Sequence, residues 1–166
     1  MRDRVRRAAA SMGQIWGIGK RRYRGNWKRR IWLFDKLVWT VAGYGADIWG
    51  WKERGELEAL QERYIRWTLG VDRCTPGYMV REEIKRGKMR TRAGRRAWMF
   101  EEKLEEGGGS EWARRCWEEM RRREGGKEEI SEWEEERREF LRKRGVEWSW
   151  DKGEVKKEEE VGNGKK

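Results

Sequence analysis

Two clusters of basic residues are the features of this chain best suited to chemistry. The first spans residues 20–30 and interleaves its cations with aromatic side chains, and the second spans residues 85–96. Lys and Arg neutralise phosphates and release counterions, while Tyr and Trp can stack on exposed bases. The alternative for both clusters is a solvated charged surface. The candidate nucleic-acid-binding residues are Lys20, Arg21, Arg22, Tyr23, Arg24, Lys28, Arg29, Arg30, Lys85, Arg86, Lys88, Arg90, Arg92, Arg95 and Arg96.

The positive charge is concentrated in the first hundred residues. The formal net charge is +11, and residues 1–55 carry 14 Lys and Arg against 4 Asp and Glu. Residues 101–166 carry 17 against 21. A cationic field attracts polyanions, chiefly nucleic acid or anionic membrane. No uncharged apolar run of eighteen residues occurs, so no spanning helix is expected.

The residue types that catalysis and metal binding require are scarce. The five Asp residues include no adjacent pair and no strand–turn–strand context, so the paired aspartates that hold two Mg²⁺ ions in polymerases are missing. His is absent, and Cys74 and Cys116 are 42 positions apart, which excludes a four-ligand zinc site and a Cys–His nucleophile. We therefore expect a protein that is not an enzyme, with no catalytic residue, no metal and no cofactor.

The start of the chain and its cysteines bear on localisation. Charged residues open the sequence, but no apolar segment follows them, so no secretory signal is visible. The two cysteines lie in different expected elements and do not indicate a disulfide framework. We expect an intracellular protein, in the nucleus or the cytoplasm.

Helical periodicity dominates the chain, and no useful period-2 pattern appears. Residues 3–16 form an expected first helix, which Gly17 and Gly19 should end before a basic loop at residues 20–26. Asn26 is the expected N-cap of a long apolar helix. The face of that helix expected to be buried carries Trp27, Ile31, Phe34, Val38 and Val41.

The remaining helices are expected from similar local signals. A helix over residues 55–69 should end at Gly70 in the left-handed conformation. Thr75 and Pro76 should open a short helix that reaches about residue 86. Further helices are expected over residues 89–104, after Ser110, and from Ser131 to about residue 144, where Ser131 and Glu134 form a capping box and residues 134–136 a solvated face. The fold class predicted is all-α, an irregular bundle of about six or seven helices.

Composition leaves the order of the chain open. Leu, Ile, Val and Phe make up only 25 of 166 residues, a level that with high net charge warns of disorder. The 13 Trp residues counter that warning, because each can bury a large apolar area. However, Arg, Glu, Gly and Trp share G-rich codons, so the Trp content can reflect a purine-biased coding strand. From residue 147 onward, few apolar and many charged residues predict a disordered tail.

The segment from residue 33 to residue 71 carries an ordered set of residues whose types and spacing match a family pattern. These positions are Tyr44, Gly45, Ala46, Asp47, Ile48 and Trp49, then Leu57, Leu60, Gln61, Arg63, Arg66, Leu69, Gly70 and Val71. They resemble the region just after the palm domain in reverse transcriptases of non-LTR (LINE-type) retrotransposons. Asp47 stands where that family usually has Glu. Residues 75–83 look like the family's continuation, and the resemblance covers about residues 5–120.

The resemblance implies a C-terminal fragment that begins near the thumb, the helical part that grips the template–primer duplex. Its domains would be a thumb-like helical region at residues 1–124, a charged helix at 125–146 and a disordered tail at 147–166. The partners that this implies are RNA, DNA or an RNA–DNA hybrid, contacted through the backbone, and no membrane. The palm domain of the parent polymerase would be a further partner. Two alternatives stay open: a helical protein-interaction module, and a non-functional relic reading frame.

Overall fold

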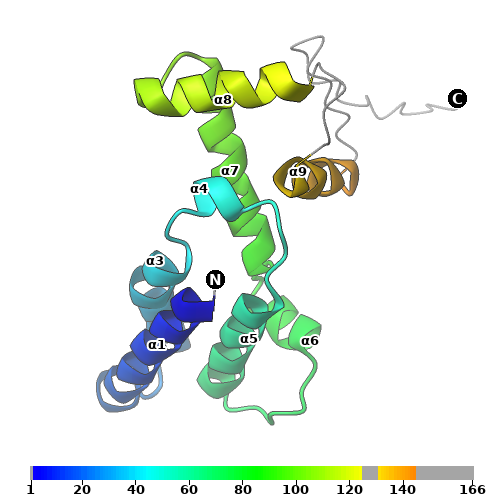
Figure 1. The fold of residues 1–166 in the computed structure, drawn as a ribbon. Coiled ribbons are helices and arrows are strands. Elements are labelled where there is room, and N and C mark those ends of the chain that lie inside the picture. The colour runs from blue at the N-terminus through cyan, green and yellow to red at the C-terminus, as the bar shows by residue number, and fades with distance from the viewer. Residues whose placement is uncertain (1, 125–130, 145–166) are drawn as a thin grey trace, which may run out of the picture. The chain divides into compact units, whose positions relative to one another are not determined.

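The computed structural model describes residues 2–124 and 131–144. Within these ranges the chain forms helices and connecting turns without a strand, which confirms the expected all-α, irregular helical architecture (Figure 1). The described residues divide into two compact units, one up to residue 97 and one from residue 98 onward. The domain limits expected near residues 125 and 147, and the expected disordered tail, involve segments outside the described residues and stay predictions. No helix of the described residues is long and apolar enough to cross a bilayer.

The first unit contains most of the helices and both basic clusters. Its boundary with the second unit falls inside the last of its helices. The helices are α1 (Arg2–Arg22), α2 (Trp27–Leu33), the π-helical η1 (Phe34–Val38), α3 (Trp39–Ala42), α4 (Ala46–Trp49), α5 (Gly55–Leu69), α6 (Gly77–Glu83) and α7 (Met89–Glu105).

Several helix ends follow their local signals. The Asn26 side chain accepts a hydrogen bond from the backbone N–H of Arg29 at 2.9 Å, and so caps α2 as expected. Gly70 ends α5 with φ of 71°, the left-handed conformation that glycine adopts without strain. The start of α6 differs slightly from the prediction, because Pro76 occupies the cap position and Gly77 opens the helix.

Helix α1 continues past both glycines that were expected to end it. Gly19 is buried, and a Cβ atom there would lie 2.8 Å from a ring carbon of Trp67 on α5. A helical glycine costs about 1 kcal/mol relative to alanine, and here close packing against the indole offsets that cost. The predicted terminator is therefore a contact point between helices. As a result, Lys20, Arg21 and Arg22 form the last turn of α1 and are not in a loop.

The long apolar helix is a continuous run of α2, η1 and α3 that changes register at its centre. In η1 the backbone N–H of Trp39 donates to the carbonyl of Phe34, five residues earlier. The extra residue rotates the buried face, so Trp39 and Ala42 are buried along with Phe34 and Val38. At the start of the run Trp27 is 41% exposed, so the predicted apolar stripe is confirmed only in its middle.

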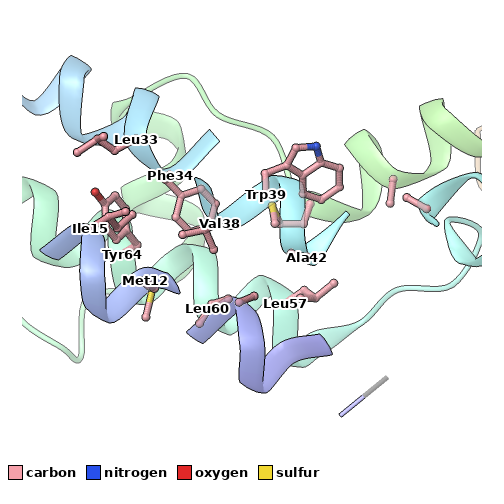
Figure 2. Close-up of a cluster of buried hydrophobic side chains, with 14 residues drawn as sticks. Met12, Ile15, Leu33, Phe34, Val38, Trp39, Ala42, Leu57, Leu60 and Tyr64 are labelled. Atoms are coloured by element: carbon pink, nitrogen blue, oxygen red, sulfur yellow. The ribbon is translucent and has the colours of Figure 1, made fainter. Parts of the chain in front are cut away.

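The core of the first unit lies where α1, the α2–α3 run and α5 meet (Figure 2). Tyr64 of α5 is fully buried there, with its ring 5.1 Å from that of Phe34, and its hydroxyl donates to the carbonyl of Arg30 at 2.9 Å. Burial raises the pKa of the Tyr64 hydroxyl. The core members labelled in Figure 2 are Met12, Ile15, Leu33, Phe34, Val38, Trp39, Ala42, Leu57, Leu60 and Tyr64.

The second unit begins with the last part of α7 and adds α8 (Glu111–Glu124) and α9 (Glu132–Arg142). Ser110 and Ser131 accept hydrogen bonds from the N–H groups of Ala113 and Glu134, as N-caps do. Glu134 does not stay on a solvated face as predicted. Its carboxylate is buried and accepts a hydrogen bond from Arg138 at 2.7 Å. The buried Arg137 is a second ionic partner, and the two cations compensate the charge of the buried carboxylate.

Candidate nucleic-acid interface

The first basic cluster occupies two helix ends and the turn between them. Lys20, Arg21 and Arg22 form the last turn of α1, where the partial negative charge of a helix C-terminus favours cations. The backbone N–H of Asn26 donates to the carbonyl of Tyr23 at 3.2 Å and closes the turn that leads into α2. Residues 20–30 thus bring together seven cationic side chains and no carboxylate.

Six of these seven cations are exposed, and none of the six forms an ion pair with a carboxylate in the described part of the chain. One of them, Lys28, places its ammonium 5.7 Å from the centre of the Trp27 ring, a cation–π contact on the surface. The six residues are Lys20, Arg21, Arg22, Arg24, Lys28 and Arg29. We refer to them as the open cluster.

Arg30 has a different role from the rest of the first cluster. Its Nε donates to the carbonyl of Tyr23 at 2.9 Å and its Nη2 to the carbonyl of Arg24 at 2.6 Å. Its guanidinium also lies 4.6 Å from the centre of the Trp67 ring on α5. Tyr23 is half-buried against the core. Arg30 therefore fixes the basic turn to α5 and holds the open cluster in place, since each of its three guanidinium nitrogens donates to a backbone carbonyl, one of them that of Thr68 on α5.

The second predicted cluster is largely neutralised within the fold. Both terminal nitrogens of Arg86 contact the carboxylate of Asp35, at 3.0 and 2.5 Å, and Arg92 contacts the same carboxylate at 2.5 Å. Burial favours the protonated form of Asp35. The hydrogen bonds and charges of the two arginines outweigh that effect and hold the pKa of Asp35 below its usual value.

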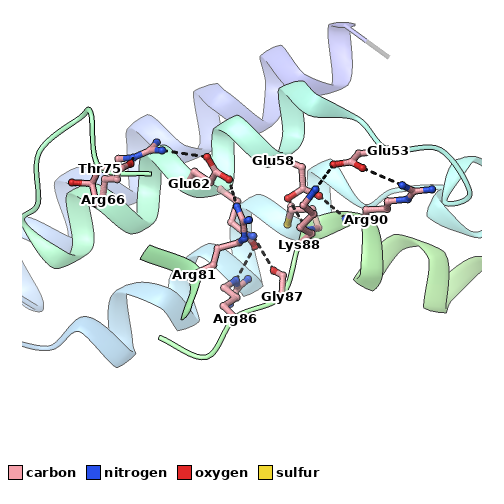
Figure 3. Close-up of polar contacts among 12 residues, drawn as sticks. Glu53, Glu58, Glu62, Arg66, Thr75, Arg81, Arg86, Gly87, Lys88 and Arg90 are labelled. Atoms are coloured by element: carbon pink, nitrogen blue, oxygen red, sulfur yellow. Dashed lines mark hydrogen bonds and ion pairs between the residues drawn. The ribbon is translucent and has the colours of Figure 1, made fainter. Parts of the chain in front are cut away.

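Four more cations of this cluster also have carboxylate partners. Lys88 and Arg90 share Glu53, at 2.8 and 3.1 Å (Figure 3). The hydrogen bond from Lys88 is the main cause of a lowered pKa for Glu53. Arg96 pairs with Asp47 at 3.1 Å, and Lys85 pairs with Glu82 at 2.5 Å. Of the predicted residues in this cluster, Arg95 alone is exposed without an ion pair to a described carboxylate.

Helix α5 fixes the segment that carries these paired cations. The buried carboxylate of Glu58 accepts from the backbone N–H groups of Met89 and Arg90, at 2.9 and 2.7 Å, and so caps α7 from another helix (Figure 3). Gln61 donates to the carbonyl of Gly87 at 3.1 Å and accepts from Arg86 at 2.8 Å. The second cluster is therefore part of the packing of the first unit.

Sequence reasoning missed the acidic partners of the second cluster and part of the aromatic surface beside the first. Asp35, Glu53 and Asp47 are separated from their arginines and lysine by 35 to 57 positions, so no local pattern could identify them. Trp32, 47% exposed on α2, was not predicted as a site residue. It lies four residues after Lys28 and four before Lys36, so a helical pattern would place it between two lysines.

Comparisons of the chain with protein-family models, with curated proteins and with solved structures found no match. Among the described residues, no group of three or more carboxylate, thiol or imidazole side chains could hold a metal ion.

Proposed function

We propose that this chain is a non-catalytic fragment of a reverse transcriptase of the non-LTR type, and that it binds the backbone of a template–primer nucleic acid. The observation that carries the proposal is the open cluster, six exposed cations without an ionic partner in the described residues, arranged around one turn. Unpaired surface cations are the groups that can exchange counterions for phosphates. The resemblance of residues 33–71 supports the choice of a polymerase substrate.

Within this proposal the two basic clusters have separate roles. The open cluster contacts phosphates, and Arg30 holds the turn that presents it. The second cluster stabilises the fold through Asp35, Glu53 and Asp47, and contributes little to binding, because all of its charges except that of Arg95 are already compensated. Backbone contacts of this kind carry no sequence information, so binding should be similar for unrelated sequences. The exposed Trp27 and Trp32 could stack on unpaired bases at the edge of such a contact.

A comparison of two triple variants tests the proposal. Arg21→Ala/Arg22→Ala/Arg29→Ala removes three members of the open cluster. The matched control, Lys85→Ala/Lys88→Ala/Arg96→Ala, removes the same charge from paired side chains whose exposures are 81%, 47% and 44%. Binding of a labelled RNA–DNA hybrid is measured by fluorescence anisotropy between about 50 and 200 mM salt.

The open-cluster variant should bind more weakly, and the slope of log K against log salt should fall by about 3 for three phosphate contacts. The control variant should change both quantities much less. Equal losses in the two variants would show that only total charge matters and would refute a localised site. A loss that depends on nucleotide sequence would refute the backbone mechanism. No binding at low salt by a demonstrably helical chain would favour a partner-binding module or a relic.

A further inference from the structure

An apolar groove runs between α1 and α5 of the first unit, and the core described above does not fill it. Its volume is about 870 Å³. Helices α1 and α5 are in contact and both belong to the first unit, so the groove lies within one compact body. Its apolar walls are Val5, Ala9 and Trp16 from α1 and Ala59, Leu60 and Trp67 from α5.

The groove is elongated, and its dimensions suit a helix. Val5 and Trp16 are eleven residues apart on one helix, which corresponds to roughly 16 Å, or three turns. Alanines on both walls, Ala9 and Ala59, leave room for another backbone to approach. A volume of 870 Å³ is near the upper end for small-molecule pockets, and a groove lined by two helices presents surface to a rod-like ligand.

The charges at the groove favour an acidic ligand. Arg63 is exposed, with its guanidinium 5.9 Å from the centre of the Trp16 ring, and Arg73 is exposed at the end of the groove. In the described ranges neither forms an ion pair with a carboxylate. Arg66, in contrast, is occupied by Glu62 at 3.2 Å and by the carbonyl of Thr75 at 2.7 Å. The lining also contains one exposed carboxylate, Glu56, so the two available arginines leave the groove with a small excess of positive charge.

We propose that the α1–α5 groove binds an amphipathic helix of a partner protein, with an apolar stripe and acidic flanks. Apolar side chains of that helix at i, i+3 or i+4, and i+7 would pack along Val5, Ala9 and Leu60. Its carboxylates would meet Arg63 and Arg73. A nucleic acid fits this surface less well, because most of the lining is apolar and two available cations are few compared with six in the open cluster.

The proposal does not depend on the nucleic-acid function, because the groove and the open cluster share no residue. The probe is a labelled synthetic peptide of about eighteen residues, with Leu at helical i, i+3, i+4, i+7 spacing and Glu on both flanks of the stripe. A control peptide has the same composition in an order that breaks the stripe. Binding to the full chain is measured by fluorescence anisotropy, and circular dichroism checks that each variant remains helical.

The striped peptide should bind at least about tenfold more tightly than the scrambled peptide. Ala59→Trp fills the groove from an exposed position and should weaken binding about tenfold. Two variants of opposite charge at the exposed Val71, which lies outside the helices, provide a second test. Val71→Glu should weaken binding by repelling the acidic flank of the peptide, and Val71→Lys should not.

Arg21→Ala/Arg22→Ala/Arg29→Ala should leave peptide binding unchanged, so failure of the groove and failure of the open cluster are distinguishable. Equal binding of the two peptides would overturn the proposal. So would equal binding by Val71→Glu and Val71→Lys. Competition by a single-stranded oligonucleotide, undiminished in the Arg21→Ala/Arg22→Ala/Arg29→Ala variant, would reassign the groove to nucleic acid.

Discussion

Substitution of Asp35 by asparagine would separate the structural role of the second basic cluster from a binding role. The carboxylate of Asp35 receives both terminal nitrogens of Arg86 and one of Arg92. Asparagine keeps the size of the side chain but has no charge, and one of its two terminal groups is a donor that would face a guanidinium. Arg86 would lose its ionic partner while remaining largely buried, with its side chain 16% exposed.

The expected loss follows from that geometry. A charged group left without its hydrogen-bonding partner costs about 1–3 kcal/mol, and breaking a fully buried ion pair costs about 3–5 kcal/mol. Asp35 is 28% exposed, so water can partly replace the lost contacts. We therefore expect Asp35→Asn to lower the free energy of unfolding by about 2 kcal/mol at neutral pH.

The stability difference between the wild type and Asp35→Asn should depend on pH. The pKa of Asp35 is lowered in the folded protein from an ordinary value of 3.8, so its stabilising effect is present above that value and is lost as the pH falls through the folded-state pKa. The difference in stability between the wild type and Asp35→Asn should be constant above about pH 5 and shrink in acid below pH 3.8. Urea unfolding followed by circular dichroism, from pH 7 downward, measures both quantities.

A matched control is Asp47→Asn, which removes the partner of the more exposed Arg96. That pair is solvated, so its loss should cost less than about 1 kcal/mol. Asp35→Asn should also strengthen nucleic-acid binding slightly at low salt, because it releases two compensated cations. Equal stability costs for the two variants, or a cost for Asp35→Asn that persists undiminished at low pH, would refute the assignment of Arg86 and Arg92 to the fold.

Two further predictions concern other buried contacts. Burial raises the pKa of Glu101 to about 7, a rise that its partner Arg137 limits, so the folded state takes up a proton more readily than the unfolded chain. Wild-type stability should therefore fall by roughly 3 kcal/mol as the pH rises from about 4.5 to 7, and Glu101→Gln should flatten that fall in urea titrations. Gly50→Ala should cost about 3 kcal/mol, because its Cβ would lie 2.4 Å from the carbonyl oxygen of Ala93. Gly13→Ala, in open space on α1, should instead stabilise by up to about 1 kcal/mol, and thermal unfolding of the two variants would test both signs.

The parts of the fold that the sequence predicted are those determined by neighbouring residues. The capping hydrogen bonds of Asn26, Gly70 and Ser110 join residues only three or four positions apart, and each of the three begins or ends a helix as expected. Gly19 does not end its helix as expected, because its role depends on Trp67, 48 positions later. A glycine that ends a helix and one that admits a neighbouring ring have the same local sequence signal.

The candidate site shows the same division. The cationic composition of both clusters was visible in the sequence, but their difference in available charge was not. Whether a cation is free depends on carboxylates such as Asp35 and Glu53, which only the packing of α2–η1 and the α4–α5 connection brings near residues 86–92. The groove between α1 and α5 was likewise not predictable, since it depends on how two helices pack. Binding by the open cluster and by the groove stays a prediction for the experiments described above.

The π-helical turn η1 has a consequence for how the gene can change. Because η1 contains one residue more than an α-helical turn would need, a deletion of one codon within residues 34–38 could leave an unbroken α-helix. The deletion would leave Trp39 and Ala42 facing the core, because the wide turn already places them where a helix one residue shorter would. An added residue that the helix takes up as regular α-helix would instead rotate every later residue by about 100° and turn Trp39 and Ala42 away from the core. The helix should therefore tolerate loss of one residue at η1 better than a gain, whereas the turn at Gly25, where a side chain would meet open space, should tolerate both.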